Sequence, residues 1–300
     1  MSVIPAIPLS MRQARALTLG VFDGVHIGHQ AVLSRLKLED PDHSLVLTFS
    51  SHPDDVLWGR KIRWICSHDQ KISLIKSFGA RHVLEIPFTR ELAEVSARRL
   101  VEDVFLAQLP SAKIVLGHDT RFGCHAEGSH EYHKAHYTGA VQSVCLEPTV
   151  FEDRPESTTR IREAVLGGEL GRAKGMLGRM FSTQGVVVKG FARGRQLGFP
   201  TANIQPRGGL VLPPLGVYAV DVLAGGRTYG AVANLGSRPT FENQSEPLLE
   251  VHLFDFNGDL YGTEIEVFWK RFIRPERRFA SKEELMAQIQ ADAQEARHGP

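Results

Sequence analysis

Short apolar runs alternate with amphipathic stretches along the first 180 residues. The apolar runs occupy residues 16–22, 45–49, 82–88, 113–117 and 141–146. The clearest amphipathic stretches between them are 30–36, 70–78 and 96–109. Strands separated by helices predict right-handed crossovers and a mostly parallel, doubly wound α/β sheet. Ligands of such sheets bind beside the carboxyl ends of the strands.

The pattern changes near Phe181, where short apolar segments follow one another with only turn signals between them. The segments read QGVVVKGF, GVYAVDVL, TYGAVANLG, LLEVHLFDF and TEIEVFWKRFI. Short strands joined by tight turns, such as the glycine pair at 225–226, predict an antiparallel barrel or sandwich. A last helix is predicted from Ser281, because SKEE has capping-box spacing. We predict two domains, residues 1–180 and 181–300.

Composition narrows the class of protein. The 300 residues are 42% hydrophobic, and 35 basic residues nearly balance 34 acidic ones, for a net charge of +1. That balance gives no general attraction to nucleic acid or to an anionic membrane. No apolar run of membrane-spanning length occurs, and the first residues lack the pattern of a signal peptide. Three cysteines without CxxC spacing are typical of a reducing cytoplasm, so we expect a cytoplasmic protein with small-molecule partners.

Residues 18–36, TLGVFDGVHIGHQAVLSRL, place His26 and His29 in a glycine-rich turn between an apolar strand and an amphipathic helix. Glycines let backbone amides approach a ligand, and the helix presents its positive end. Imidazoles at such a place can donate to phosphate oxygens and stabilise charge that develops during transfer. The alternative is a turn whose histidines only cap the helix. Neither a GxxxxGK[ST] nor a GxGxxG motif is present.

A second candidate is ESTTRIREAVLGG at residues 156–168. Ser157, Thr158 and Thr159 supply hydroxyls at a predicted helix start, and Arg160 and Arg162 add fixed charges. The planar arginine fork suits phosphate oxygens. The alternative is an ordinary capped helix with arginines in solvent.

The pairing of HxGH with a later S-[ST]-T-x-I-R run resembles the nucleotidyltransferase superfamily. The fuller strings GVFDGVHIGHQ, TFSSHP at 48–53 and GHDTRFG at 117–123 resemble the FMN adenylyltransferase half of bacterial bifunctional riboflavin kinase/FAD synthetases. The resemblance implies that His26 and His29 bind the ATP phosphates and stabilise the transition state. It also implies an ATP pocket made by Gly20, Phe22, Asp23, Gly24, Thr158, Thr159 and Arg162. The flavin site implied beside it is made by His52, Pro53 and Asp119.

This half departs from the family pattern at a few positions. Ser51 replaces the proline before His-Pro, and Thr120 replaces the aromatic residue after Asp119. Thr158 stands where the family prefers serine, and RPES at 154–157 replaces an apolar lead-in. The implied reaction is attack of the FMN phosphate on the ATP α-phosphorus, which expels pyrophosphate and depends on positioning and charge stabilisation.

The stretch GFARGRQLGFPTANI, residues 190–204, offers a second kind of chemistry. Its glycines allow a close approach of backbone to ligand, and Thr201 and Asn203 present oxygens on one side of an extended segment. Such ligands suit Mg²⁺ that bridges nucleotide phosphates. The alternative is a turn into a strand, with Thr201 and Asn203 bonded to local backbone.

GRQLGFPTAN resembles the riboflavin kinase signature, and GVYAV, NLGSRPTF and LEVHLFDFNGDLYG follow in the family order. The resemblance implies a six-stranded barrel in which Thr201 and Asn203 bind Mg²⁺ and ATP phosphates. Glu250 is then the general base for the ribityl 5′-hydroxyl. Gly190, Gly198 and Pro200 fall in the implied ATP site, and Arg274 in the flavin site. Period-two spacing places Glu250 on the face of Leu248, Phe254 and Phe256, where we expect a carboxylate buried among apolar side chains.

One further stretch, CHAEGSHEYHKAH at 124–136, carries one cysteine and four histidines. Its spacing is poor for zinc, and we interpret it as a solvated polar helix.

The whole pattern predicts one enzyme that makes FMN from riboflavin and then FAD from FMN, with ATP as co-substrate and Mg²⁺ as cofactor. Two alternatives stay open. The chain could keep only the kinase, with a transferase pocket eroded at 51, 120 and 155–158, or it could be a non-catalytic flavin-binding regulator. The sequence leaves the oligomeric state undetermined.

Overall fold

The computed structural model describes residues 6–299 apart from 111, 138, 190–198 and 238–246. The chain packs as two compact units. The first comprises Met1–Arg63 and His68–Thr158, and the second Trp64–Ser67 and Thr159–Pro300. Helices α7 (Thr158–Leu166) and α8 (Leu170–Leu177) therefore pack mainly with the second unit. The functional boundary near residue 180 stays a prediction.

The first unit is built on a five-stranded sheet whose order is β3-β2-β1-β4-β5. All neighbouring strands pair in parallel, as the alternation of apolar runs and helices predicts. The strands are β1 (Ala16–Leu19), β2 (Leu45–Phe49), β3 (His82–Ile86), β4 (Lys113–Gly117) and β5 (Ser143–Leu146). A short hairpin, β6 (Val150–Phe151) and β7 (Arg154–Pro155), follows the sheet.

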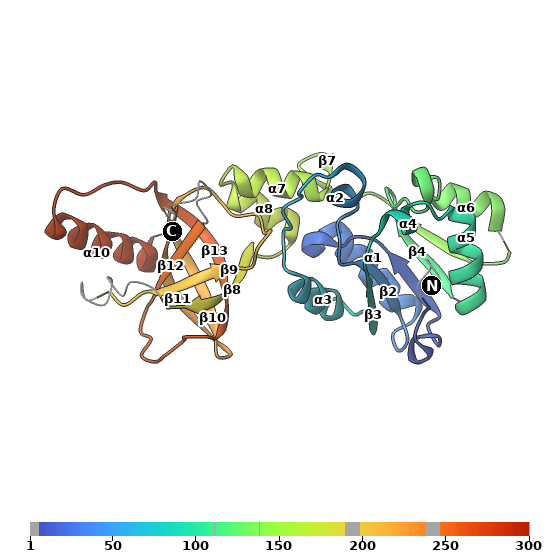
Figure 1. Ribbon diagram of the computed structural model, residues 1–300, viewed down its shortest axis with the longest axis horizontal. Coiled ribbons are helices and arrows are strands. Elements are labelled where there is room, and N and C mark those ends of the chain that lie inside the picture. Colours follow the sequence, from blue (N-terminus) through green and yellow to red (C-terminus); the bar gives the residue numbers. More distant parts are fainter. Residues whose placement is uncertain (1–5, 111, 138, 190–198, 238–246, 300) are drawn as a thin grey trace. The chain divides into compact units, whose positions relative to one another are not determined.

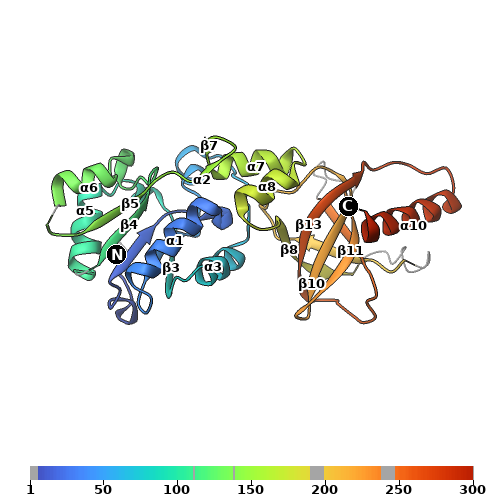
Figure 2. The same cartoon turned by 180° about the vertical axis from the view of Figure 1, so that it is seen from behind.

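Successive residues of the central strands enter two separate cores, which is what a doubly wound sheet requires. Ala16 packs in one core with Leu33 and Ile75 from the helices that follow β1 and β2. Leu17 packs in the other with Phe105 and Tyr137. Figure 2 shows α1 and α3 together on one face of the sheet. The doubly wound α/β fold predicted from the sequence is thus confirmed.

The helical segments of this unit vary in length and regularity. They are η1 (Leu9–Met11), η2 (Asp23–Val25), α1 (Ile27–Glu39), α2 (Pro53–Trp58), α3 (His68–Ser77), α4 (Arg90–Ala93), α5 (Ala97–Leu100), η3 (Val101–Leu106), η4 (Cys124–Ala126) and α6 (His130–Tyr137). The single helix expected over 96–109 is an α-helical turn, α5, followed by the π-helical segment η3. No helix within the described ranges is both long and apolar enough to cross a membrane.

The expectation of a solvated polar helix in the histidine-rich stretch is wrong for one face of α6. His133 is only 1% exposed and Tyr137 9%, because these residues are four apart and both face the core. His130 bonds instead to the Ser143 hydroxyl at 3.2 Å. Among the described residues, no group of three or more His, Cys, Asp or Glu is placed to hold a metal ion.

The second unit contains a closed six-stranded antiparallel barrel in the order β10-β11-β12-β9-β8-β13 (Figure 1). The strands are β8 (Ser182–Val188), β9 (Ala202–Pro206), β10 (Gly216–Ala224), β11 (Arg227–Ser237), β12 (Pro247–Leu253) and β13 (Glu264–Arg274). The barrel expected from the resemblance is confirmed, and the sandwich alternative is wrong, because closure leaves the sheet without free edges.

Two local signals in this unit act as the sequence predicts. Gly225 and Gly226 have φ values of +57° and +78° and form the tight turn between β10 and β11. Helix α10 (Lys282–His298) begins after Ser281, whose hydroxyl accepts the Glu284 N–H at 3.1 Å. The Glu284 side chain accepts the Ala280 N–H in return, at 3.1 Å. Helix α10 covers an outer patch of the barrel that includes Phe254.

Gly185 is a position where the barrel has no room for a side chain. A Cβ there would lie 2.5 Å from the Gln205 carbonyl oxygen and 2.6 Å from Ile204 Cγ2 on the paired strand β9. We expect Gly185→Ala to lower the free energy of unfolding by about 1–3 kcal/mol, because the strands must separate to admit the methyl group. Urea denaturation followed by circular dichroism measures this. Gly208→Ala, where a Cβ meets open space, is the matched control and should change stability by less than about 0.5 kcal/mol. Equal effects would contradict the packing argument.

Candidate active sites

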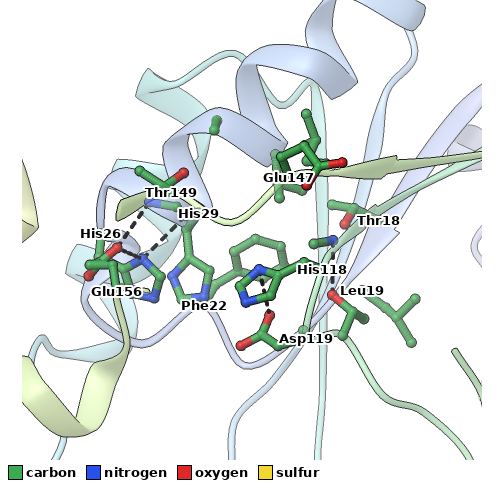
Figure 3. A pocket seen from close by; sticks show the side chains of 17 residues that line it. Thr18, Leu19, Phe22, His26, His29, His118, Asp119, Glu147, Thr149 and Glu156 are labelled. Atoms are coloured by element: carbon green, nitrogen blue, oxygen red, sulfur yellow. Dashed lines mark hydrogen bonds and ion pairs between the residues drawn. The ribbon is translucent and has the colours of Figure 1, made fainter. Parts of the chain in front are cut away.

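A cleft lies at the carboxyl ends of β1, β4 and β5 in the first unit (Figure 3). The helix after β1 covers one face of the sheet and the helix after β4 covers the other, so the cleft sits at the switch point where such sheets bind ligands. The residues lining it include Gly20, Phe22, His26, His29, Asp119 and Glu156. Sequence reasoning assigned roles to all of these except Glu156.

The turn between β1 and α1 has an unusual backbone. Phe22, Gly24 and Val25 have φ values of +53°, +70° and +41°. Positive φ is costly for a β-branched valine, and strain of this kind collects at functional sites. Phe22, Asp23 and His26 are buried in spite of their place in a turn. These buried side chains anchor the turn, and both histidines line the cleft.

His26 is the N-cap residue of α1, and its side chain is 10% exposed. Its Nδ1 lies 2.7 Å from Glu156 Oε2, and the same oxygen accepts the Gly28 N–H at 3.1 Å. The His26 ring also stacks on His29 with a centroid separation of 3.6 Å. The helix start, the two imidazoles and the carboxylate thus form one contiguous group (Figure 3).

His29 lies against both His26 and Phe22, whose ring centroid is 4.9 Å away. Burial holds the pKa of His29 well below its usual value, and the nearby charge of His26 lowers it further. Its Nδ1 is buried and has no hydrogen-bond partner within the described part of the chain. His29 is therefore neutral in the free protein at neutral pH.

The remaining predicted residues of this half lie in several places. Asp23 and Gly24 form the buried turn η2 beside the cleft. His52 accepts the Asp54 N–H at 3.1 Å and caps α2, with Pro53 as the first helical residue. Thr158 begins α7, which also carries Thr159 and Arg162 and which packs mainly with the second unit.

Two of the residues that depart from the family pattern make defined contacts in the structure. The hydroxyl of Thr120 accepts the Gly117 N–H at 3.0 Å and closes the turn after β4. Glu156, which sequence analysis passed over, is the buried acid of the cleft. In the sequence, the only indication of Glu156 was its charge in the RPES segment, which replaces the apolar lead-in implied by the resemblance.

The barrel brings together the oxygen-bearing residues of the second candidate site. Asn203 of β9 pairs in register with Glu250 of β12, and Glu250 pairs with Asn234 of β11. Register partners share a face of the sheet, so the three side chains form a row across neighbouring strands. Asn234 was not singled out from the sequence, although it lies in the NLGSRPTF stretch.

The expected burial of Glu250 among apolar side chains is wrong. The core-facing residues of β12 are Leu249, Val251 and Leu253, whereas Leu248, Glu250 and His252 are only partly buried. The period-two pattern is correct, but its apolar face is the other one. Glu250 lies on the outer face of the barrel, where a carboxylate keeps contact with polar neighbours and solvent.

The segment before β9 is held to the same face. His252 Nδ1 lies 2.8 Å from the Pro200 carbonyl oxygen, and its ring packs edge-on to Phe199 at 5.6 Å. Thr201 follows at the start of the strand and is half-buried. Gly190 and Gly198 lie outside the described residues.

Arg274, placed in the flavin site by resemblance, has a structural partner. Its guanidinium contacts both Asp292 oxygens at 2.7–3.1 Å and so joins β13 to α10. Glu276 lies just after β13, and its Oε1 accepts a hydrogen bond from Asn234 Nδ2, in the row with Glu250, at 3.4 Å.

The two units together define a class: an HxGH nucleotidyltransferase sheet joined in one chain to a six-stranded kinase-type barrel. Comparison with known families agrees with this division. A family model described as FAD synthetase matches residues 9–160, and one described as riboflavin kinase matches residues 177–299. The chain belongs to the bifunctional riboflavin kinase/FMN adenylyltransferase family.

Individual relatives match almost the whole chain. The bifunctional riboflavin kinase/FMN adenylyltransferase of Listeria monocytogenes is 34% identical over 94% of this chain and 91% of its own. The protein of that name from Escherichia coli K12 is 36% identical over 94% and 91%. A crystal structure from Streptococcus pneumoniae, described as a macrolide-efflux protein, is 30% identical with a TM-score of 0.86 and covers 98% of this chain and 99% of its own.

The lowered pKa of His29 makes stability depend on pH. Below about pH 6.5 the unfolded chain binds a proton at this residue that the folded protein does not. The free energy of unfolding should therefore fall as the pH drops from about 7 to 5. Burial lowers the pKa of His82 and His133 as well, which adds to the same trend. Urea denaturation at several pH values measures the slope. His29→Gln should flatten it, and an unchanged slope would show that His29 is not buried in its neutral form.

Proposed function

We propose that this chain makes FMN from riboflavin and ATP on the barrel, and FAD from FMN and ATP in the cleft of the parallel sheet. The observation that carries the proposal is that each unit holds its own group of polar side chains. The histidine pair lies at a helix N-terminus in the cleft, and the Asn203–Glu250–Asn234 row lies on the barrel. The curated relatives carry both activities in their names.

In the cleft, we propose that His26 and His29 bind the triphosphate of ATP beside the N-terminus of α1. A phosphate oxygen of FMN attacks the α-phosphorus, and the bond to the α–β bridging oxygen breaks, which releases pyrophosphate. No covalent enzyme intermediate is needed. The donors near the bridging oxygen stabilise the negative charge that grows there, and the rigid turn holds them in place before the reaction begins.

On the barrel, we propose that Glu250 removes the proton of the ribityl 5′-hydroxyl. The oxygen bonds to the γ-phosphorus of ATP, and the bond to the β–γ bridging oxygen breaks, which releases ADP. Thr201 and Asn203 offer the hydroxyl and amide oxygens that suit Mg²⁺, beside the Glu250 carboxylate. The ion, when bound, neutralises charge on the phosphates.

A reducing cytoplasm remains the predicted compartment, and all three cysteines are free.

Two variants separate the half-reactions. His29→Ala should lower FAD formation from FMN by about 100-fold or more, because a donor to the developing charge is lost. Glu250→Ala should lower FMN formation from riboflavin by about 100- to 10,000-fold, because the general base is lost. Each purified variant is incubated with ATP and Mg²⁺ and with riboflavin or FMN, and the flavins are separated by chromatography.

The chain offers a matched control for each variant. His136→Ala removes an exposed histidine of the first unit, and Glu264→Ala removes an exposed carboxylate on β13 that pairs with Arg207. Both should retain both activities. If His29→Ala or Glu250→Ala removed both reactions while the protein stayed folded, the assignment of two separate sites would be wrong. Absence of FAD from the unaltered protein would favour the kinase-only alternative.

A further inference from the structure

Glu156 is a buried carboxylate inside a site proposed to bind phosphates. It follows the short strand β7, and its backbone N–H donates to the Thr149 carbonyl oxygen at 3.0 Å. The side chain is 1% exposed. An anion at this place opposes phosphate binding unless it acts through another group. The position belongs to RPES at 154–157, the segment that departs from the apolar lead-in implied by the resemblance.

The short contact between Glu156 and His26 requires a proton between the two side chains. At 2.7 Å, His26 Nδ1 and Glu156 Oε2 are too close to be two unprotonated acceptors. The Gly28 N–H also reaches Oε2, a contact that suits an ionised carboxylate and a proton on His26 Nδ1, whereas the other oxygen, Oε1, is buried with no hydrogen-bond partner in the described part of the chain. The His29 N–H also points at Nδ1, at 3.3 Å, but a protonated Nδ1 has no lone pair to accept it, so a proton on Nδ1 excludes this second hydrogen bond.

With Nδ1 held in this way, Nε2 is the nitrogen of His26 that can meet a ligand. No other described residue makes a hydrogen bond to it. A carboxylate that holds one imidazole nitrogen fixes the tautomer and the orientation of the ring, and it stabilises positive charge there. Among the described residues, none is such a partner for the buried Nδ1 of His29, so the two stacked rings differ in electrostatic character.

Gly28 makes the close contact between Glu156 and His26 sterically feasible. A Cβ on this residue would lie 3.1 Å from His26 Cε1 and 3.4 Å from Glu156 Oε2. A Cβ at this position would press on the His26 ring and would touch the carboxylate at an ordinary contact distance. The glycine of the HxGH motif therefore serves the pair in this chain as well as the start of the helix.

We propose that Glu156 is a positioning residue for adenylyl transfer, which holds His26 by its Nδ1–H so that the charged ring presents Nε2–H to the ATP phosphates. The proposal rests on the transferase function proposed above. It assigns Glu156 no contact with substrate. Its effect passes through the groups that it contacts, the His26 ring and the Gly28 N–H.

A competing interpretation gives the same contacts the opposite effect. In it, the carboxylate occupies the anion site at the N-terminus of α1 and must leave before ATP binds. Removing the charge would then raise kcat/KM for ATP. If Glu156 positions His26, removing the charge lowers kcat/KM. The direction of the change therefore separates the two interpretations.

The test compares Glu156→Gln and Glu156→Asp with the unaltered protein. Glutamine keeps the shape and loses the charge, whereas aspartate keeps the charge on a shorter arm. We expect Glu156→Gln to lower kcat/KM for FAD formation by about 10- to 100-fold, the cost typical of losing an orienting carboxylate. Glu156→Asp should recover part of the loss. Riboflavin phosphorylation by the same molecules is the internal control and should change less than about twofold, and so should both reactions of Glu91→Gln, an exposed acid of the same unit.

A pH profile provides a readout that simple loss of structure does not give. Glu156→Gln should move the alkaline limb of the FAD-forming profile to lower pH, because the carboxylate no longer stabilises the charged ring. The other titratable groups that line the cleft are His29, His118, Asp119 and Glu147, and all stay unchanged in the variant.

Nitrogen-15 NMR of the histidine side chains tests the proton directly, without activity. The His26 resonance, assigned by its loss in His26→Asn, should report a proton on Nδ1 in the unaltered protein. A resonance that reports an unprotonated Nδ1, an unchanged pH profile in Glu156→Gln, or a rise in kcat/KM would each overturn the proposal. Failure of the unaltered protein to make FAD would overturn the transferase function instead, and the NMR result would still decide the contact.

Discussion

The central place of β1 in the parallel sheet is the constraint on which the first unit depends. This strand pairs with β2 on one side and β4 on the other, and its residues Ala16 and Leu17 are both fully buried in different cores. Because parallel neighbours can be reached only by crossovers, the chain must turn at the end of β1 and start a helix over one face. That requirement places the turn with His26 and His29 at the edge of the sheet where ligands bind.

Charge in the cleft is arranged unevenly around two rings that touch. Two imidazoles 3.6 Å apart are unfavourable as two cations in a buried place, and the pKa of His29 is held low by burial and by the charge of His26. The Glu156 carboxylate contacts only one of them. The two rings of the cleft therefore differ in their surroundings: His26 has a carboxylate beside it, and His29 is buried in its neutral form.

Successive side chains of the barrel strands point alternately to the buried core and to the outer face, where the polar residues of the candidate site lie. Leu249 and Val251 of β12 are fully buried in the core, while Glu250 between them belongs to the outer face. The register of the neighbouring strands β9, β12 and β11 brings Asn203 and Asn234 to either side of Glu250. The ion pair of Arg274 with Asp292 then fastens α10 to another part of the barrel wall.

Local periodicity and turn chemistry were enough to predict the alternation of strands and helices, the change from a parallel sheet to antiparallel strands and the capping box at Ser281, while the choice of a barrel over a sandwich came from the resemblance of the motifs. Tertiary structure alone decided which face of β12 is buried, since both alternate sets contain apolar residues and only the closed barrel selects one. It also decided that Asn234 joins Glu250 and that Glu156 meets His26, 130 residues away in the chain. Such contacts arise from strand register and from the crossing of distant segments, which no local pattern records.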